Sequence, residues 1–272
     1  MVQAGATVKQ LQAALPLAPL ENRILLCHAL GLPRVALITQ SERALTPDEA
    51  QQLGALVQRR LDGEPIAYIV GQREFFGLPF KVAPGVLIPR PDTELLVELA
   101  LERLPANGRL LDMGTGSGAI AVACAHNRKD AVVTALDVSD EALAIARTNA
   151  AANEVAVRFL RSDWFAALAS ERFELIASNP PYIASGDEHL VQGDLRFEPV
   201  GALTDHADGL AALRTIVEGA PAHLEPGGWL LLEHGYDQSA SVRALLAARG
   251  FQDVQSWCDL AGIERVSGGR LA

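Results

Sequence analysis

Apolar positions along the first part of the chain recur at helical spacing. Leucine, isoleucine and alanine side chains follow one another at steps of three and four residues between positions 11 and 30, which is the period of one helix face. Thr46 and Pro47 open a further predicted helix as N-cap and first helical residue. This helix runs to about Leu61 and stops at a turn of Asp, Gly, Glu and Pro. We therefore expect residues 1–70 to form a small helical domain.

The pattern then changes to an alternation of apolar and polar side chains between Tyr68 and Val82, around Gly77. Alternation about a central glycine is typical of a β-hairpin. We expect a hairpin linker over residues 71–88. Three prolines follow and make a stiff approach to a helix that begins near Asp92.

From about residue 108, short apolar strands alternate with helices, which predicts a mostly parallel sheet covered on both faces. The expected strands are 109–111, 132–136, 156–160, 174–177, 229–232, 254–257 and 265–271. The expected helices between them are 119–126, 140–152, 210–223 and 238–249. The fold class is α/β, with a Rossmann-like domain over residues 89–272 built on a seven-stranded sheet. Ligands of such sheets bind at the carboxyl ends of the strands.

The composition excludes several classes of protein. The net charge is −10, and no run is rich in lysine or arginine, whereas gripping a nucleic-acid backbone requires positive charge. Nucleic acid is therefore disfavoured as the main partner. No stretch approaches the roughly 20 apolar residues that cross a bilayer, and the N-terminus lacks the features of a secretory signal. Three scattered cysteines fit no metal-ligand spacing. We expect a soluble cytoplasmic protein without a metal site.

A glycine-rich segment follows the first expected strand. After Asp112 and Met113 it reads Gly114, Thr115, Gly116, Ser117, Gly118. Glycines allow a sharp turn and let a ligand lie on the backbone. Dinucleotide folds use the spacing Gly-x-Gly-x-x-Gly, but position 119 here is alanine. Asp112 would face a cationic ligand better than a pyrophosphate. The segment therefore favours S-adenosylmethionine, which carries a sulfonium and an ammonium and no phosphate.

Asp137 directly follows the second expected strand. A carboxylate at this place can accept hydrogen bonds from both ribose hydroxyls of a nucleoside cofactor. The alternative role is an N-cap of the next helix, for which Ser139 and Asp140 are better placed. We expect Asp137 to bind the ribose.

Asp163 and Trp164 follow the third expected strand. Asp163 is expected to accept a hydrogen bond from an adenine amino group while Trp164 or Phe165 packs on the ring. A helix cap followed by core aromatic residues is the alternative.

The most specific signal follows the fourth expected strand, where the chain reads Asn179, Pro180, Pro181, Tyr182. Two consecutive prolines fix φ twice and cannot continue a sheet. They would hold the Asn179 side-chain oxygen and the Pro180 carbonyl rigidly, as acceptors for the two N–H bonds of a planar amide or amino nitrogen. Such positioning can contribute about 7–11 kcal/mol to catalysis in favourable cases. Tyr182 is expected to cover the planar face of the substrate.

In the sequence, this tetrapeptide follows the glycine-rich segment, Asp137 and Trp164. With these residues in this order, the chain resembles the PrmC/HemK family. These are methyltransferases of glutamine in peptide chain release factors. The resemblance extends over nearly the whole length and includes the segments 77–79, 88–94, 162–165, 197–199, 232–235 and 259–262. The chain departs from the family's pattern at Gly269, where a bulkier residue is usual.

The resemblance implies a helical N-terminal domain for substrate recognition, a hairpin linker and a Rossmann-like class I catalytic domain. It implies methyl transfer from S-adenosylmethionine, leaving S-adenosylhomocysteine, to the side-chain nitrogen of the glutamine in the Gly-Gly-Gln loop of class 1 release factors. It places the cofactor against residues 114–118, Asp137, Trp164 and Asn179, and the glutamine against residues 179–182.

Enzymes that methylate adenine or cytosine amino groups use the same tetrapeptide, so a DNA or RNA amino methyltransferase is the alternative. It requires a basic recognition surface and a base-flipping pocket. A binding module without catalytic activity and a nicotinamide dehydrogenase are further alternatives. The glycine spacing and the Asn-Pro-Pro-Tyr sequence both argue against the dehydrogenase.

Overall fold

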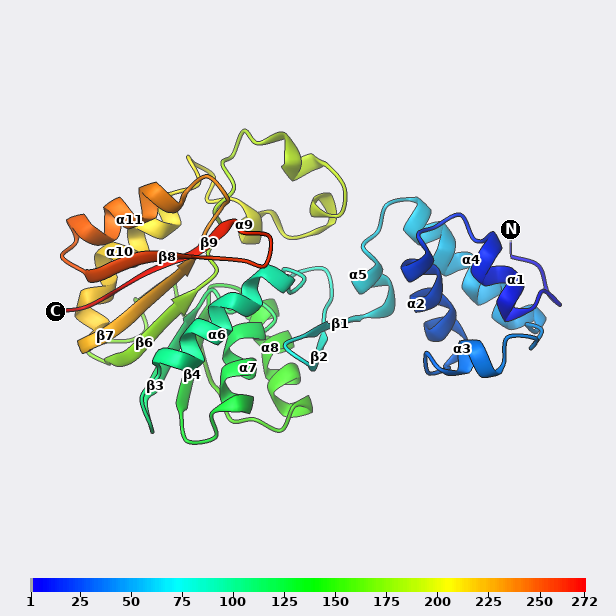
Figure 1. Ribbon diagram of the computed structural model, residues 1–272, viewed down its shortest axis with the longest axis horizontal. Coiled ribbons are helices and arrows are strands. Elements are labelled where there is room, and N and C mark those ends of the chain that lie inside the picture. Colours follow the sequence, from blue (N-terminus) through cyan, green and yellow to red (C-terminus); the bar gives the residue numbers. More distant parts are fainter. Residues whose placement is uncertain (1) are drawn as a thin grey trace. The chain divides into compact units, whose positions relative to one another are not determined.

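The structure, a computed structural model, describes residues 2–272, and the chain forms two compact units that meet in sequence at Gly71 and Gln72. Figure 1 shows the helices and strands of both units. In the described part of the first unit the regular elements are all helices, beside an isolated β-bridge between Thr7 and Ala44. Its helices are α1 (Val8–Ala14), α2 (Pro19–Leu30), α3 (Ala36–Thr39), α4 (Pro47–Leu61) and α5 (Ile66–Val70).

The start of α4 confirms the capping signal read from the sequence. The Thr46 hydroxyl accepts a hydrogen bond from the Glu49 backbone N–H at 3.3 Å, and the Glu49 carboxylate accepts one from the Thr46 N–H at 2.9 Å. This reciprocal arrangement satisfies two N–H groups that a helix start otherwise leaves unpaired. The helix then buries Leu53 completely in a core that includes Leu25 and Leu26 of α2.

The predicted hairpin begins later than the alternation indicated. Residues from Tyr68 to Val70 belong to α5, which ends at Gly71 in a left-handed conformation with φ of +75°. The hairpin itself consists of β1 (Gln72–Phe75) and β2 (Leu78–Lys81). A short apolar run fits a buried helix as well as a strand, and the burial of Tyr68 and Ile69 explains why the pattern misled here.

The second unit contains the predicted seven-stranded, mostly parallel sheet. Its strands are β3 (Arg109–Met113), β4 (Val132–Asp137), β5 (Arg158–Arg161), β6 (Phe173–Ser178), β7 (Leu224–Glu233), β8 (Gln252–Cys258) and β9 (Glu264–Arg270). They lie in the order β5-β4-β3-β6-β7-β9-β8, and β9 runs antiparallel to both of its neighbours. The start of β7 lies five residues before the predicted one, because Pro226 and Gly227 within it read as a turn.

Helices cover both faces of this sheet (Figure 1). One layer contains α6 (Glu94–Arg103), α7 (Ala119–Asn127) and α8 (Asp140–Ala152), and the other contains α10 (Ala211–His223) and α11 (Ser239–Ala248). Successive strand residues alternate between the two cores, with Leu175 in the α6–α7 core and Ile176 in the α10–α11 core. Short elements complete the unit: η1 (Pro91–Thr93), η2 (Glu188–Val191), η3 (Leu195–Phe197) and α9 (Val200–Leu203).

The glycine that departs from the family pattern lies in β9, where space is restricted. A Cβ atom at Gly269 would lie 2.9 Å from the Cβ of Phe251, and one at Gly268 would lie 2.6 Å from the Leu230 carbonyl oxygen. Neither position has room for a side chain in this packing. Within the described part of the chain, no helix is long and apolar enough to cross a membrane.

Candidate active site

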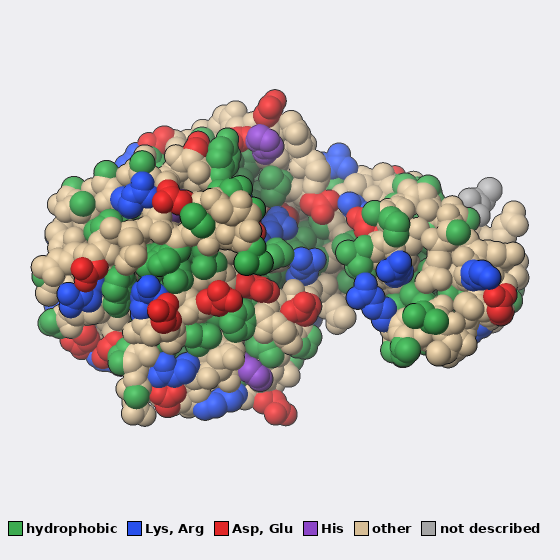
Figure 2. Space-filling model, in the orientation of Figure 1, with side chains coloured by type: hydrophobic (Ala, Val, Ile, Leu, Met, Phe, Trp, Pro, Cys, Tyr) green, Lys and Arg blue, Asp and Glu red, His purple; other side chains and the backbone are tan. Residues whose placement is uncertain are grey.

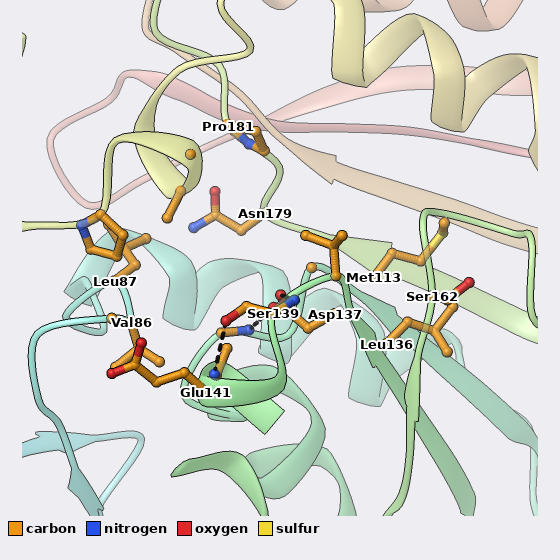
Figure 3. Close-up of a pocket in the computed structure, with 18 of the residues that line it drawn as sticks. Val86, Leu87, Met113, Leu136, Asp137, Ser139, Glu141, Ser162, Asn179 and Pro181 are labelled. Carbon is orange, nitrogen blue, oxygen red and sulfur yellow. Dashed lines mark hydrogen bonds between the residues drawn. The ribbon is translucent and has the colours of Figure 1, made fainter. Parts of the chain in front are cut away.

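A cavity of about 370 Å³ opens at the carboxyl ends of β3, β4 and β6 (Figure 3). It lies where the loops after several predicted strands meet, as expected for a sheet of this type. Its lining residues are Gly85, Val86, Leu87, Met113, Gly114, Gly116, Leu136, Asp137, Val138, Ser139, Glu141, Ala142, Ser162, Asp163, Trp164, Asn179, Pro181, Pro199, Gly201 and Ala202.

The loop after β3 forms one wall of this pocket with its backbone. Gly114 and Gly116 line the cavity with φ of +71° and +53°, a conformation that side chains rarely adopt. The loop is tied to β4, because the Thr115 N–H donates to the Leu136 carbonyl at 2.8 Å. Gly118 does not line the pocket. It packs closely on α8, because a Cβ there would lie 3.1 Å from the Cβ of Ala146. Ser117 and Thr115, also predicted to contact the cofactor, are buried and outside the lining as well.

Asp112 lies beneath the glycine loop and not in the pocket lining, which corrects the expectation that it faces the ligand. Its Oδ2 accepts hydrogen bonds from the Thr115 hydroxyl at 2.6 Å and the Ala121 N–H at 3.1 Å. Burial raises the pKa of this carboxyl to about 7. Oδ1 has no hydrogen-bond partner among the described residues. The side chain therefore braces the loop from below.

Asp137 ends β4 and lines the pocket, as its position in the sequence indicated. Its Oδ2 accepts from the Gly116 N–H and its Oδ1 from the Ser139 N–H, each at 2.9 Å (Figure 3). Burial raises the pKa of the carboxyl, and these backbone donors counteract that rise. The helix-cap role falls to Ser139, whose hydroxyl accepts from the Ala142 N–H at 3.2 Å. Asp137 is thereby held in place with its carboxylate at the cavity.

The two aromatic residues after β5 have separate positions. Trp164 lines the pocket beside the exposed Asp163, and its backbone adopts a φ of +44°. Phe165 instead stacks on His223, with ring centroids 4.8 Å apart, and packs against Gly219 of α10. Of the two aromatic side chains proposed to pack on a ligand ring, only Trp164 is at the cavity.

The tetrapeptide after β6 contributes its first and third residues, Asn179 and Pro181, to the lining, whereas Pro180 is buried and Tyr182 is not part of it. The Asn179 Nδ2 donates to the Thr93 hydroxyl at 3.1 Å. Its Oδ1 is therefore the atom left to accept a hydrogen bond from a bound molecule. Burial raises the pKa of the Tyr182 hydroxyl well above its usual range.

A second wall of the pocket was not predicted from the sequence. Val86, Leu87 and Pro199 line it, together with Gly201 and Ala202 of α9. Glu198 joins the two segments: its Oε2 accepts from the Ile88 N–H at 2.9 Å, and its Oε1 is bonded to Arg90. The only signal in the sequence was the resemblance of residues 88–94 and 197–199 to one family. That resemblance does not indicate that Glu198 contacts Ile88 and Arg90, more than a hundred positions earlier in the chain.

Glu141 was also missed. It lies in the first turn of α8, its side chain reaches the pocket, and its carboxylate occupies the space above Gly85, where a Cβ would lie 2.5 Å from the Glu141 Cδ. Together with Asp137 and Asp163 it gives the lining three carboxylates. None of the described lining residues is Lys, Arg or His. An acidic cavity with apolar walls suits a cationic nucleoside and disfavours a pyrophosphate.

Two family profiles match the chain: "PrmC N-terminal domain" over residues 6–71 and "Methyltransferase small domain" over residues 90–194. The chain is 57% identical to the release factor glutamine methyltransferase of Burkholderia pseudomallei, over 98% of this chain and 96% of the relative. It is 47% identical to the protein of the same name from Escherichia coli, over 92% of this chain and 91% of that one.

Solved structures of more distant proteins share the fold. A methyltransferase from Pyrococcus furiosus superposes with a TM-score of 0.55 at 22% identity, over 78% of this chain and 96% of that chain. The 16S rRNA N2 G1207 methyltransferase of T. thermophilus, solved with AdoMet and guanosine, gives a TM-score of 0.54 at 24% identity, over 74% of this chain and 50% of that one. At this identity the likeness shows a methyltransferase fold. The near full-length identity to the closer relatives shows more: this chain belongs to the family of release factor glutamine methyltransferases.

Proposed function

We propose that the chain transfers a methyl group from S-adenosylmethionine to the side-chain amide nitrogen of the glutamine in the Gly-Gly-Gln loop of class 1 peptide chain release factors. Membership of the family supports the reaction, and the names of the relatives support the release factor as substrate. The observation that carries the proposal is that Asn179 and Pro181 line the same cavity as Gly114, Gly116 and Asp137.

The cofactor is S-adenosylmethionine, and the residues of the pocket fit it. Asp137 offers a carboxylate for ribose hydroxyls, the backbone of the glycine loop leaves room for a ligand, and Trp164 offers an aromatic surface. Thr115, Ser117 and Gly118 support the glycine loop from outside the lining. Asp163, in the lining, is assigned to accept a hydrogen bond from the adenine amino group. When bound, the cofactor supplies a methyl group on a positively charged sulfur. The three carboxylates of the lining favour that charge.

Asn179 and Pro180 act on the glutamine. An amide nitrogen is a poor nucleophile because its lone pair is delocalised into the carbonyl. The Asn179 Oδ1 and the Pro180 carbonyl accept its two N–H bonds, which orients the nitrogen toward the methyl group. The hydrogen bond from the Asn179 Nδ2 to Thr93 supports this assignment, because it leaves Oδ1 as the free atom of the amide. Pro181 and Tyr182 close the site around the planar group.

Recognition of the protein substrate is assigned to the helical unit, residues 1–70, and the domain of residues 89–272 carries the chemistry after the linker 71–88. On the face of the second unit seen in Figure 2, acidic and basic side chains are interspersed. This distribution and the net charge of −10 favour a protein over a nucleic acid as the main partner. Because release factors act in translation, the proposal places the reaction in the cytoplasm.

Mass spectrometry of a class 1 release factor incubated with the protein and S-adenosylmethionine tests this function. The expected result is the mass of one methyl group on the peptide that contains the Gly-Gly-Gln loop. A release factor with glutamic acid in place of that glutamine is the matched control and gains no methyl group. Methyl transfer to DNA or RNA, with none to the release factor, would refute the proposal in favour of the nucleic-acid amino methyltransferase.

A further inference from the structure

The second wall of the pocket is built from two segments that are far apart in the chain. Val86 and Leu87 lie between β2 and η1, whereas Pro199 and two residues of α9 come from the loop region after β6. Each segment has backbone hydrogen bonds of its own. The Val86 N–H donates to the Ala83 carbonyl, and the Ala202 N–H donates to the Pro199 carbonyl. The position of one segment relative to the other therefore depends on contacts between them.

Glu198 provides such a contact with its side chain. Its Oε2 accepts a hydrogen bond from the Ile88 N–H at 2.9 Å, and its Oε1 forms an ion pair with Arg90. Glu198 directly precedes Pro199, and Ile88 directly follows Leu87, so both bonds are made next to lining residues. No part of the Glu198 side chain is exposed. One buried carboxylate thus joins the two halves of the second wall.

The far end of α9 is tied to the tetrapeptide. The Ile183 N–H donates to the Leu203 carbonyl at 2.9 Å, and Ile183 pairs with Thr204 in an isolated parallel bridge. Ile183 directly follows Tyr182. The helix α9 is therefore held at one end by backbone bonds and at the other by the Glu198 side chain. Loss of Glu198 would release one end and leave the other attached.

A buried carboxylate costs free energy unless it is paired and hydrogen-bonded. Replacing a buried ion pair by apolar residues is often neutral or stabilising, so stability alone does not account for a charge at this place. The two bonds of Glu198 instead define a geometry. A guanidinium and a backbone N–H each approach a carboxylate oxygen from a limited range of directions. The arrangement of the two wall segments is fixed in consequence.

We propose that Glu198 is a positioning residue for cofactor binding: with Arg90 and the Ile88 N–H, it holds the second wall in the arrangement that receives S-adenosylmethionine. A wall that is free to move leaves only a fraction of the molecules competent to bind, and the apparent Kd rises in proportion. The inference rests on the proposed function, which places the cofactor in this cavity. It adds Glu198 and Arg90 to the residues on which binding depends, although neither lines the cavity.

The test uses the full chain and the variant Glu198→Gln, which has nearly the same shape. Its single oxygen can accept from Ile88 or from Arg90, and its NH₂ group then faces the other donor. We expect Kd for S-adenosylhomocysteine, measured by calorimetry, to rise about tenfold. KM for S-adenosylmethionine should rise similarly, whereas kcat at saturation should change by less than about threefold, because bound cofactor selects the competent wall. Wild-type Kd in Glu198→Gln would overturn the inference.

Glu174→Gln is the matched control. The Glu174 carboxylate also accepts from a backbone N–H, that of Arg109 at 2.6 Å, and from the side chain of the same arginine at 3.1 Å. Arg109 begins β3, at the end of the strand opposite the pocket. The variant loses the same kinds of bond, and its Kd for S-adenosylhomocysteine should stay within about twofold of the wild type. An equal rise in Kd in both variants would refute a specific role of the second wall.

Two variants of Arg90 keep the inference testable if Glu198→Gln folds poorly. Arg90→Lys keeps a positive charge beside Glu198 and should bind S-adenosylhomocysteine nearly as the wild type does. Arg90→Met removes that charge and should weaken binding as Glu198→Gln does. In the double variant of Glu198→Gln and Arg90→Met the losses should not add, because both changes break one link. Additive losses, or full affinity in Arg90→Met, would refute the link. Absence of binding by the wild-type protein would instead refute the proposed function itself.

Discussion

The side chain of Gln238 donates a hydrogen bond of 2.9 Å to the backbone carbonyl of Tyr182, although 56 positions separate the two residues. The same Nε2 lies 3.2 Å from the Gly209 carbonyl, and the Oε1 accepts from the Gly235 N–H at 2.8 Å. Gln238 thus joins three loops at the end of the tetrapeptide. The space between them is full, since a Cβ at Gly209 would lie 2.5 Å from the Tyr182 oxygen.

Replacing Gln238 by Glu is expected to destabilise this junction. The variant keeps an acceptor for the Gly235 N–H but loses the NH₂ group that serves two carbonyls. The loss of such bonds costs about 1–3 kcal/mol when the partners are left unpaired. We expect the free energy of unfolding in urea to fall by about that amount, and kcat to fall because the tetrapeptide loses its support. An unchanged kcat at lowered stability would show that Gln238 supports only the fold.

Asn179→Ala is expected to keep the fold while losing most of the methylation rate. Asn179 is half-buried and has one side-chain hydrogen bond in the protein, to Thr93, so little stability depends on it. Its Oδ1 is the acceptor assigned to the substrate N–H. Single-turnover rates with a release factor measure the loss, and Asn127→Ala, which removes one bond to the Ala123 carbonyl at a helix end, is the matched control. Equal rates in both variants would contradict the assignment.

Stability should decrease as the pH rises toward neutrality. Burial raises the pKa of Asp112 and of Glu233 to about 7 in the folded protein. A group with a raised pKa binds its proton more tightly in the folded state, so its contribution to stability is present below its unfolded pKa. That contribution is lost as the pH rises through about 7, with a slope of at most about 1.4 kcal/mol per pH unit for each group.

Unfolding free energies measured between about pH 5.5 and 8 check this trend. In Glu233→Gln, part of the slope in stability should vanish, because one of the two titrating carboxyls is absent. Asp92→Asn is the control for the neighbouring charge: because Asp92 raises the pKa of Glu233, its loss should move the change in stability to lower pH. An unchanged slope in Glu233→Gln would contradict the raised pKa of Glu233.

The parts of the site that the sequence predicted are those that follow a strand directly. Asp137 and Asn179 come immediately after apolar strands, and parallel strands bring their carboxyl ends to one edge, so local pattern was enough. Glu198 was missed because its partners lie far away in the chain. Only the packed structure shows that Ile88 and Arg90 are beside it. Trp164 and Phe165 were equivalent in sequence, and only the structure shows that Trp164 lines the pocket while Phe165 packs on His223.

Asp137→Asn should weaken binding of S-adenosylhomocysteine about tenfold. The carboxylate accepts two hydrogen bonds of 2.9 Å from backbone N–H groups and lines the cavity. In the asparagine variant, an NH₂ group replaces one of the two acceptor oxygens. One hydrogen bond to the ribose is then lost, or the NH₂ group points at a backbone N–H. Either change costs about 1–3 kcal/mol of binding free energy. Calorimetry with S-adenosylhomocysteine measures the change. Asp140→Asn, on the exposed first turn of α8, is the matched control and should bind normally. Equal affinities would remove Asp137 from the ribose role.

The helical unit should affect recognition of the protein substrate and leave the chemistry unchanged. Val35 and Ile38, beside and within α3, are 63% and 77% exposed and offer two large apolar side chains at the surface of the helical unit. We expect Val35→Ser combined with Ile38→Ser to raise KM for the release factor several-fold at unchanged kcat, as loss of uniform binding does. The control is Val132→Ser, a 57% exposed valine at the amino end of β4, the end of that strand opposite the pocket. An unchanged KM in the double variant would exclude this surface, and a lowered kcat would show that the helical unit takes part in more than docking.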